Sequence, residues 1–243
     1  NLVAHKLGPA LAAGNSVVLK PAEQAPLSAV MLVEVLIEAG LPEGQVCLLT
    51  GYGSEFGAEL VSSKDVAMVS YTGGEAVGEI IAREAGIKRL TMELGANSPV
   101  IVMNDCNLEQ AADACVSGAY WAVGQNCIGV QRIYVHRAIY SEFRDLVQEK
   151  TRQLVVGDPL LDSTDIGPMI NETEALRIEA WVEQALADNA VLIAGGKREG
   201  SIYYPTALEN VPVDAKLVYC EAFGPVVSLF QFEDLDEAIA DAI

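Results

Sequence analysis

Residues 67–93 have the sequence AMVSYTGGEAVGEIIAREAGIKRLTME. The short apolar run at 67–71 predicts a strand, the helical periodicity at 74–84 predicts a helix, and 89–93 predicts a second strand. A strand, a helix and a strand in this order are typical of a parallel sheet flanked by helices. This segment therefore predicts an α/β fold.

The same alternation extends toward the amino terminus. It predicts strands at 16–19 and 46–49, separated by a helix at 27–39 that ends at Gly40 and Pro42. We expect one face of this helix to carry its large apolar side chains, which are Leu32, Val33, Leu36 and Ile37.

The alternation continues toward the carboxyl terminus on a larger scale. The strands expected there are 98–102, 131–136, 190–194 and 225–230, and the helices are 108–122, 139–154 and 173–188. Gly95 and Pro99 interrupt the pattern, so we expect one domain at 1–94 and a second at 95–243.

Composition excludes several classes of partner. A chain of 243 residues with 51% hydrophobic and 20% charged residues is expected to form a packed core. Its formal net charge of −19 disfavours nucleic acids and anionic membranes. The most apolar stretch, 29–39, contains Glu34 and Glu38, and no signal peptide precedes it, so we expect no membrane span.

Cysteine and histidine usage disfavours disulfides and metals. The chain has five cysteines, an odd number, and no two of them are spaced as C-x-x-C. The two histidines, His5 and His136, are far apart in the sequence. We therefore expect no metal site and a reducing, cytoplasmic location.

Cys127 is a candidate nucleophile. It lies in Gly124-Gln125-Asn126-Cys127, just past the expected end of a helix, where a turn can present the thiolate to a carbonyl group. Most cysteines are instead small buried apolar residues, and spacing alone leaves that alternative open.

Glu93 is a candidate general base. It ends an apolar strand and is followed by Gly95 and Pro99. Partial burial would raise its pKa toward the range of a general base. The alternative is a surface acid at the end of a strand.

Lys20 and Glu23 follow the first expected strand and could together hold the hydroxyls of a ribose, or form an ordinary polar turn. The glycines at 51, 53 and 57 miss the dinucleotide fingerprint by one residue. The turn Thr72-Gly73-Gly74, with Gly78 after it, is better placed to face a pyrophosphate, although a plain turn remains the alternative.

Taken together and in order, these segments resemble the aldehyde dehydrogenase superfamily along the whole chain. The matching segments are KLGPALAAGNSVVLKPAEQAPLSA, GYGSEFGAELV, VSYTGGEAVG, TMELGANSPVIV, GQNCIGVQRIYVH, VGDPLLDSTDIGPMI and CEAFGPVV. The resemblance implies the second half of a Rossmann-like cofactor domain at 1–94, followed by most of an α/β catalytic domain at 95–243.

The resemblance also implies a reaction and its catalytic residues. Cys127 matches the family nucleophile, whose thiolate adds to an aldehyde, and its backbone N–H supplies half of the oxyanion hole. The resulting thiohemiacetal loses a hydride to NAD(P)+, and water activated by Glu93 hydrolyses the thioester.

The cofactor contacts follow from the same resemblance. Lys20 and Glu23 match residues at the adenosine ribose, and Gly53 and Gly57 match residues beside the adenine. The residues matched near the pyrophosphate and nicotinamide are Thr72, Gly74 and Gly78, together with Glu221 at the nicotinamide ribose and Phe223 at the ring. The carboxylate of Glu23 favours NAD over NADP.

The chain departs from the family pattern in three places. Gly74 stands where many members have Ser, and Ala96 replaces the usual second Gly after the base. The oxyanion Asn would fall four residues before Asn1. Since the chain also begins without Met and ends inside a helical pattern, we expect an internal fragment that has no turnover by itself.

Two alternatives to hydrolytic aldehyde oxidation remain. One is a CoA-acylating semialdehyde dehydrogenase, a class that typically lacks the base matched by Glu93. The other is a catalytically inert fragment or structural relative. The resemblance further implies a homodimer or homotetramer acting on a small-molecule aldehyde, and no residue of the chain selects which aldehyde.

Overall fold

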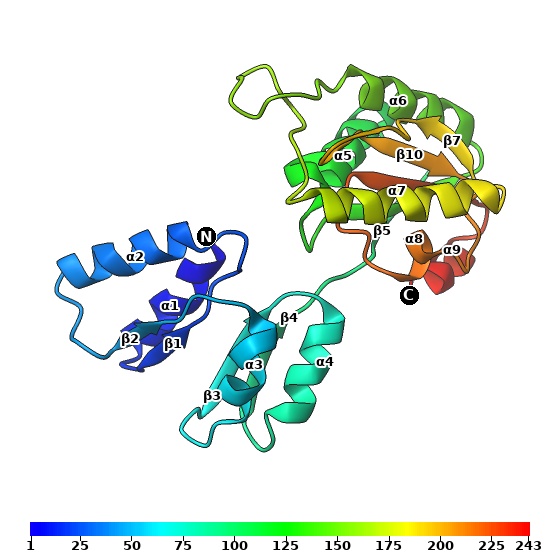
Figure 1. Cartoon of the computed structure of the whole chain (residues 1–243). Helices are drawn as coiled ribbons and strands as arrows, with labels where there is room; N and C mark the ends of the chain where they lie inside the picture. Colours follow the sequence, from blue (N-terminus) through cyan, green and yellow to red (C-terminus); the bar gives the residue numbers. More distant parts are fainter. The chain divides into compact units, whose positions relative to one another are not determined.

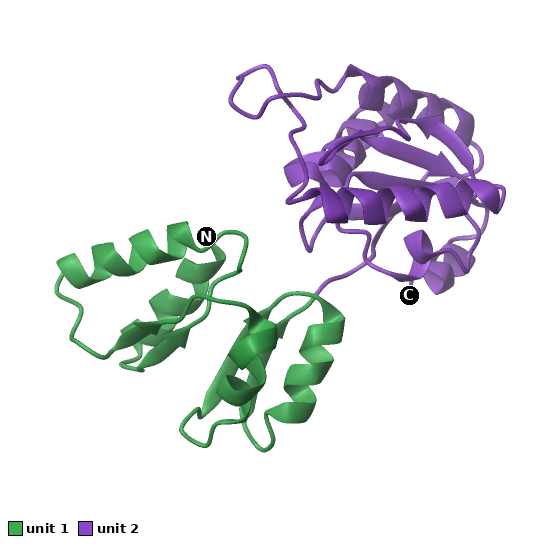
Figure 2. Cartoon of the chain, in the orientation of Figure 1, with its two compact units in different colours: residues 1–94 green, residues 95–243 purple.

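The computed structural model describes all residues, 1–243, and divides into two compact units (Figures 1 and 2). Unit 1 comprises Asn1–Leu94 and unit 2 comprises Gly95–Ile243. Each unit combines helices with mainly parallel strands, as the alternation in the sequence predicts. No helix has both the length and the apolar character needed to cross a membrane.

The first half of unit 1 is built around two short parallel strands. β1 (Val17–Leu19) pairs with β2 (Val46–Leu48), and they are accompanied by α1 (Leu2–Ala12) and α2 (Leu27–Glu38). The apolar face expected on α2 is only partly correct, because Val33 is buried whereas Ile37 is 59% exposed. Two strands of three residues cover only a narrow strip of the helix.

The second half of unit 1 has a small core of its own. Its elements are α3 (Gly53–Ser62), β3 (Met68–Thr72), α4 (Glu75–Glu84) and β4 (Arg89–Glu93). β3 and β4 are parallel, and Val61, Ile81 and Ala85 are buried against them. The helix α3 was not predicted from the sequence, because its two glycines, Gly53 and Gly57, are unfavourable in helices.

Unit 2 contains a five-stranded sheet in the order β5-β6-β11-β10-β7. Its strands are β5 (Ser98–Val102), β6 (Val130–His136), β7 (Val191–Ala194), β10 (Thr206–Glu209) and β11 (Val226–Phe232). All neighbouring pairs are parallel except β10 and β7, which are antiparallel. The sequence analysis missed β10, which has only four residues and follows Pro205.

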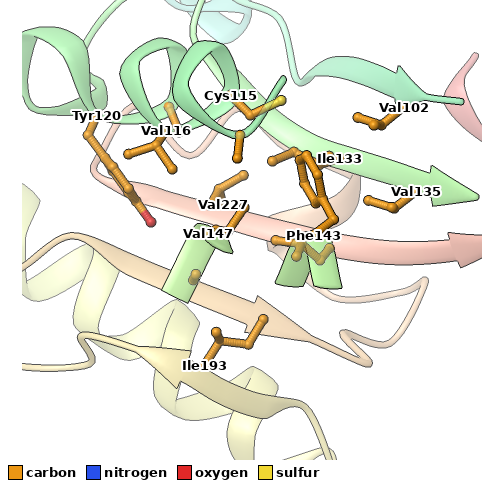
Figure 3. Packing of buried hydrophobic residues seen from close by; sticks show 14 of the residues in the cluster. Val102, Cys115, Val116, Tyr120, Ile133, Val135, Phe143, Val147, Ile193 and Val227 are labelled. Atoms are coloured by element: carbon orange, nitrogen blue, oxygen red, sulfur yellow. The ribbon is translucent and has the colours of Figure 1, made fainter. Parts of the chain in front are cut away.

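Helices bury both faces of this sheet. α5 (Leu108–Tyr120) and α6 (Tyr140–Gln153) pack on one face, where Phe143 and Val147 are inaccessible to solvent beside Ile133 and Val135 (Figure 3). α7 (Glu172–Ala187) supplies a second core through Ala175, Ile178, Val182 and Ala185. Their spacing of three and four residues is that of one helix face.

The remaining elements of unit 2 are short. They are the 3₁₀ helix η1 (Trp121–Gly124), the hairpin strands β8 (Arg198–Glu199) and β9 (Ile202–Tyr203), α8 (Lys216–Tyr219) and α9 (Leu235–Ala242). Figure 1 labels α8 and α9. The segment η1 and the residues between α8 and β11 carry the candidate site.

Candidate functional site

In unit 1, the structure brings Lys20, Glu23 and Gly53 together. Oε1 of Glu23 accepts hydrogen bonds from Nζ of Lys20 at 3.1 Å and from the backbone amide of Gly53 at 2.8 Å. The hydrogen bond from Gly53 is the largest cause that lowers the pKa of Glu23 to about 2, and Lys20 contributes in the same direction. Glu23 is therefore an ionised carboxylate at neutral pH, suited to accept hydrogen bonds from ribose hydroxyls.

These residues follow the carboxyl ends of β1 and β2, and Thr72 ends β3. Burial raises the pKa of Tyr71, and the negative charge of Glu23 contributes to the rise, so the end of β3 lies near the Glu23 turn. Sites in parallel α/β sheets lie at the carboxyl ends of strands. Lys20, Glu23 and Thr72 therefore lie at or just after the carboxyl ends of strands in unit 1.

Two features at the end of β3 fit a polar ligand. The hydroxyl oxygen of Thr72 is buried without a hydrogen-bond partner. The next helix, α4, begins after Gly74 with no side chain capping its first amides, so these amides are available to an anion such as a pyrophosphate. Buried polar atoms and free helix amides are groups that a bound dinucleotide can satisfy.

The glycines of unit 1 have different surroundings. A Cβ at Gly74 or Gly57 would meet no atom within 4 Å. The serine that many family members have in place of Gly74 would therefore have space for its side chain. Gly78 instead packs on Leu94, since a Cβ there would lie 2.6 Å from Cδ2 of that leucine. The amide of Gly78 already donates to the carbonyl of Gly74, at 3.1 Å, and is therefore not free for a phosphate.

Glu93 is the last residue of β4 and is exposed rather than partly buried. Side chains alternate along a strand, so Leu90 and Met92 face the core of unit 1 while Glu93 faces away from it. The carboxylate is therefore accessible to water.

In unit 2, Cys127 is an exposed free thiol on the turn between η1 and β6. Three successive residues before it have left-handed backbone conformations: Ala122 at φ 53°, Val123 at φ 60° and Gly124 at φ 65°. This region is uncommon for residues other than glycine and a true outlier for valine, at a cost of about 1–3 kcal/mol for each strained residue. Such strain typically persists where the surrounding structure holds a functional turn.

Hydrogen bonds fix the turn on both sides of Cys127. The Gln125 side chain accepts from the amide of Ile170 at 3.0 Å, and the Asn126 side chain donates to the carbonyl of Trp121 at 3.1 Å. The amide of Gly129 donates to the carbonyl of Asn126 at 3.2 Å. The exposed thiol is therefore presented from a rigid segment.

Gly124 gives a testable consequence of this arrangement. A Cβ there would lie 2.1 Å from the carbonyl oxygen of Gly224, whereas a Cβ at Gly200, at φ 60°, would meet nothing within 4 Å. We expect Gly124→Ala to destabilise the protein by about 1–3 kcal/mol more than Gly200→Ala, because only the former adds a clash to the shared backbone strain. Thermal unfolding of both variants measures the difference, and equal melting temperatures would contradict it.

Glu221 lies against the backbone at the start of unit 2. A Cβ at Gly95 would come within 1.9 Å of Oε2 of Glu221, so any side chain at that position would displace the Glu221 carboxylate. Oε1 of Glu221 is buried without a hydrogen-bond partner. Burial is the largest influence on this carboxyl and raises its pKa. An unpartnered carboxylate oxygen is the group expected to accept from a ribose hydroxyl.

Phe223 follows two residues later, is 39% exposed and has a left-handed φ of 47°. It lies three residues before the start of β11. The contact between Gly124 and Gly224 joins this turn to the Cys127 turn.

The site residues of unit 2 share one edge of the sheet. Gly95 precedes β5, Cys127 precedes β6 and Glu221 precedes β11, and these three strands are adjacent and parallel. The amino ends of adjacent parallel strands lie at the same edge, so segments far apart in sequence meet there. No group of three or more His, Cys, Asp and Glu side chains is arranged to hold a metal ion.

The sequence analysis did not assign a role to a buried polar network at this edge. Arg132 donates to both the side chain and the carbonyl of Asn97, at 3.0 and 2.9 Å, and Asn97 donates to the carbonyl of Cys220 at 2.7 Å. Gln131, next to Arg132, is 4% exposed and also hydrogen-bonded on this edge. The only sign of this network in the sequence is the pair Gln131 and Arg132 near the start of an otherwise apolar strand.

Comparison with known proteins identifies similar sequences and structures. A family model described as "Aldehyde dehydrogenase family" matches residues 1–242. The chain is 56% identical over 240 residues to aspartate-semialdehyde dehydrogenase 1 of Pseudomonas canavaninivorans, covering 99% of this chain and 51% of that protein. It is 50% identical to the 3-sulfolactaldehyde dehydrogenase of Priestia megaterium, covering 99% and 50%.

Among solved structures, the glyceraldehyde-3-phosphate dehydrogenase GapN from Methanocaldococcus jannaschii, complexed with NADP, superimposes with a TM-score of 0.95 at 39% identity. This match covers 100% of the chain and 54% of that structure. The chain therefore spans about half the length of the relatives that it matches.

Proposed function

Because the chain belongs to the aldehyde dehydrogenase family, we propose that the protein carrying it oxidises an aldehyde to the carboxylate with NAD(P)+. The observation that carries the proposal is the exposed thiol of Cys127 on a strained, hydrogen-bonded turn in contact with the Glu221 turn. Unit 1 would be part of the cofactor domain, and unit 2 would be part of the catalytic domain.

In this mechanism the Cys127 thiolate adds to the aldehyde carbon and forms a thiohemiacetal. The backbone amide of Cys127 would supply one hydrogen bond to the oxyanion. The chemistry supplied by a bound nicotinamide is acceptance of the hydride that leaves the thiohemiacetal carbon, which converts the adduct into a thioester. Glu93 would then remove a proton from water, whose oxygen attacks the thioester carbon and releases the acid and the free thiol.

The residues that would hold the cofactor lie in both units. Glu23 and Lys20 would bind the adenosine ribose, next to Gly53 and Gly57. Thr72 and the start of α4 after Gly74 would lie near the pyrophosphate, with Gly78 contributing packing. Glu221 and Phe223 would hold the nicotinamide riboside. The unpartnered oxygens of Thr72 and Glu221 and the ionised Glu23 support this assignment.

The substrate is proposed as a small aldehyde that carries an acidic group. The relatives named for aspartate semialdehyde and 3-sulfolactaldehyde act on aldehydes of this class according to their names.

A product assay on the full-length protein tests the proposal. We expect aspartate semialdehyde or 3-sulfolactaldehyde with NAD+ to give equal amounts of NADH and free acid, because the Glu93-activated water takes the acyl group. NAD+ should be used more efficiently than NADP+, since the charged Glu23 repels a 2′-phosphate. Acyl-CoA formation that outpaces free acid when CoA is added would overturn the hydrolytic assignment.

A further inference from the structure

Gln131 links two backbone segments on either side of Glu221. It is the second residue of strand β6 and is almost fully buried, at 4% exposure. Nε2 donates to the carbonyl of Ala96 at 2.6 Å, and Oε1 accepts from the amide of Ala222 at 2.7 Å. Both ends of the amide are therefore used, and both partners are backbone groups.

Each partner of Gln131 bears directly on the Glu221 carboxylate. The backbone amide of Ala96 lowers the pKa of this carboxyl, opposing the larger effect of burial, which raises it. Gly95, next to Ala96, has no Cβ that would collide with Oε2 of Glu221. The backbone at 95–96 therefore packs directly against the Glu221 carboxylate.

Both backbone polar groups of Ala222, the residue after Glu221, are hydrogen-bonded. The Ala222 N–H donates to Oε1 of Gln131, and the Ala222 carbonyl accepts from Nη2 of Arg177 at 2.7 Å. Ala222 is 1% exposed, so water cannot replace either bond without a rearrangement. Gln131 and Arg177 therefore hold the backbone next to Glu221.

We propose that Gln131 is a positioning residue that fixes the Glu221 carboxylate for the nicotinamide ribose of bound NAD(P). It does not touch the cofactor or the reacting atoms. It acts by linking the backbone at 95–96, against which the carboxylate packs, to the backbone amide of Ala222. The carboxylate is therefore preorganised before the cofactor binds. This inference rests on the proposed function, because that proposal assigns Glu221 to the ribose.

The variant Gln131→Met keeps the length of the side chain and removes both hydrogen bonds. In the full-length protein we expect it to raise the Kd for NAD(P) roughly tenfold or more, because the Ala96 carbonyl and the Ala222 amide lose their buried partner. The KM for NAD(P) should rise with it, while kcat at saturating cofactor falls less. Amide hydrogen exchange at Ala222 should accelerate in the cofactor-free protein.

Gln148→Met is the matched control. Gln148 lies on α6, and its Nε2 donates to the carbonyl of Ile193 at 2.6 Å, so this variant loses a bond of the same type and length. We expect it to leave the NAD(P) affinity and the exchange at Ala222 unchanged. Equal weakening by both variants would make Gln131 a merely structural residue and overturn the inference.

Glu221→Gln separates this inference from the function on which it rests. If Glu221→Gln weakens NAD(P) binding and Gln131→Met does not, the role of Gln131 is wrong and the proposed function stands. If Glu221→Gln leaves the Kd unchanged, the assignment of Glu221 to the ribose is wrong, and the inference about Gln131 is overturned with it.

Discussion

Replacing Cys127 by alanine is expected to abolish aldehyde oxidation in the full-length protein, with a loss of roughly a thousand-fold or more in kcat. The methyl group cannot add to a carbonyl, so neither the thiohemiacetal nor the thioester can form. Both the initial burst of NADH and the steady rate should disappear, and stopped-flow absorbance of the reduced cofactor measures both.

The control for this variant is Cys47→Ala. Cys47 is also an exposed free thiol but lies on β2 of unit 1. It should retain the wild-type rate. Titration of Cys127→Ala with NAD(P) distinguishes loss of chemistry from loss of folding, because the cofactor residues are untouched and the affinity should be kept. Substantial turnover by a folded Cys127→Ala would require another nucleophile.

Replacing Glu93 by glutamine is expected to preserve the burst of NADH and to slow the steady rate by roughly 10²–10⁴-fold. The amide has nearly the shape of the carboxylate but cannot accept a proton from water. Acylation and hydride transfer therefore proceed once for each active site, and the thioester accumulates. Rapid mixing measures the burst, and mass spectrometry of the quenched protein detects the acylated Cys127.

Glu79→Gln removes the same charge from an exposed acid on α4 and should leave both phases unchanged. A normal steady rate for Glu93→Gln would remove this residue from the mechanism. Addition of CoA gives a further test, because rapid turnover of Glu93→Gln with CoA, with acyl-CoA as product, would show that the thioester is open to thiol transfer.

The Cys127 variant therefore tests formation of the thioester intermediate, and the Glu93 variant tests its hydrolysis. Cys127 is needed before the thioester exists, and Glu93 is needed only to remove it. Neither residue is identified by its environment alone, since Cys127 and Glu93 are both exposed. The order of motifs along the chain supports both roles, and for Cys127 the strained turn that presents the thiol supports it as well.

Much of the fold follows from local patterns in the sequence. The predictions for β4 and β5 coincide with the observed strands, Arg89–Glu93 and Ser98–Val102, and those for α2 and α6 differ only at their ends. These segments have strong apolar periodicity or clear glycine and proline boundaries. The predicted α/β class is confirmed by the parallel-dominated sheet and by similarity to known structures at TM-scores near 0.95.

The elements that the sequence analysis missed have weak local signals. The strand β10 has four residues, yet it lies between β11 and β7, and β7 runs antiparallel to it. This short segment is a strand because it pairs with both neighbouring strands, and local periodicity in the sequence does not reveal such pairing. The left-handed residues Ala122 and Val123 were likewise unforeseen, because packing around the Cys127 turn overrides their helical preference.

The sequence by itself determined the alternation of strands and helices, the order of the motifs and the identity of Cys127 and Glu93 as candidates. These depend on residue types and spacings that are local in the chain. Only the tertiary structure decided that the Glu221 carboxylate packs directly on Gly95, and that Gln131 holds Ala96 and Ala222 together. The two hydrogen bonds of Gln131 join residues separated by 35 and 91 positions, and they arise because adjacent parallel strands bring their amino ends to one edge.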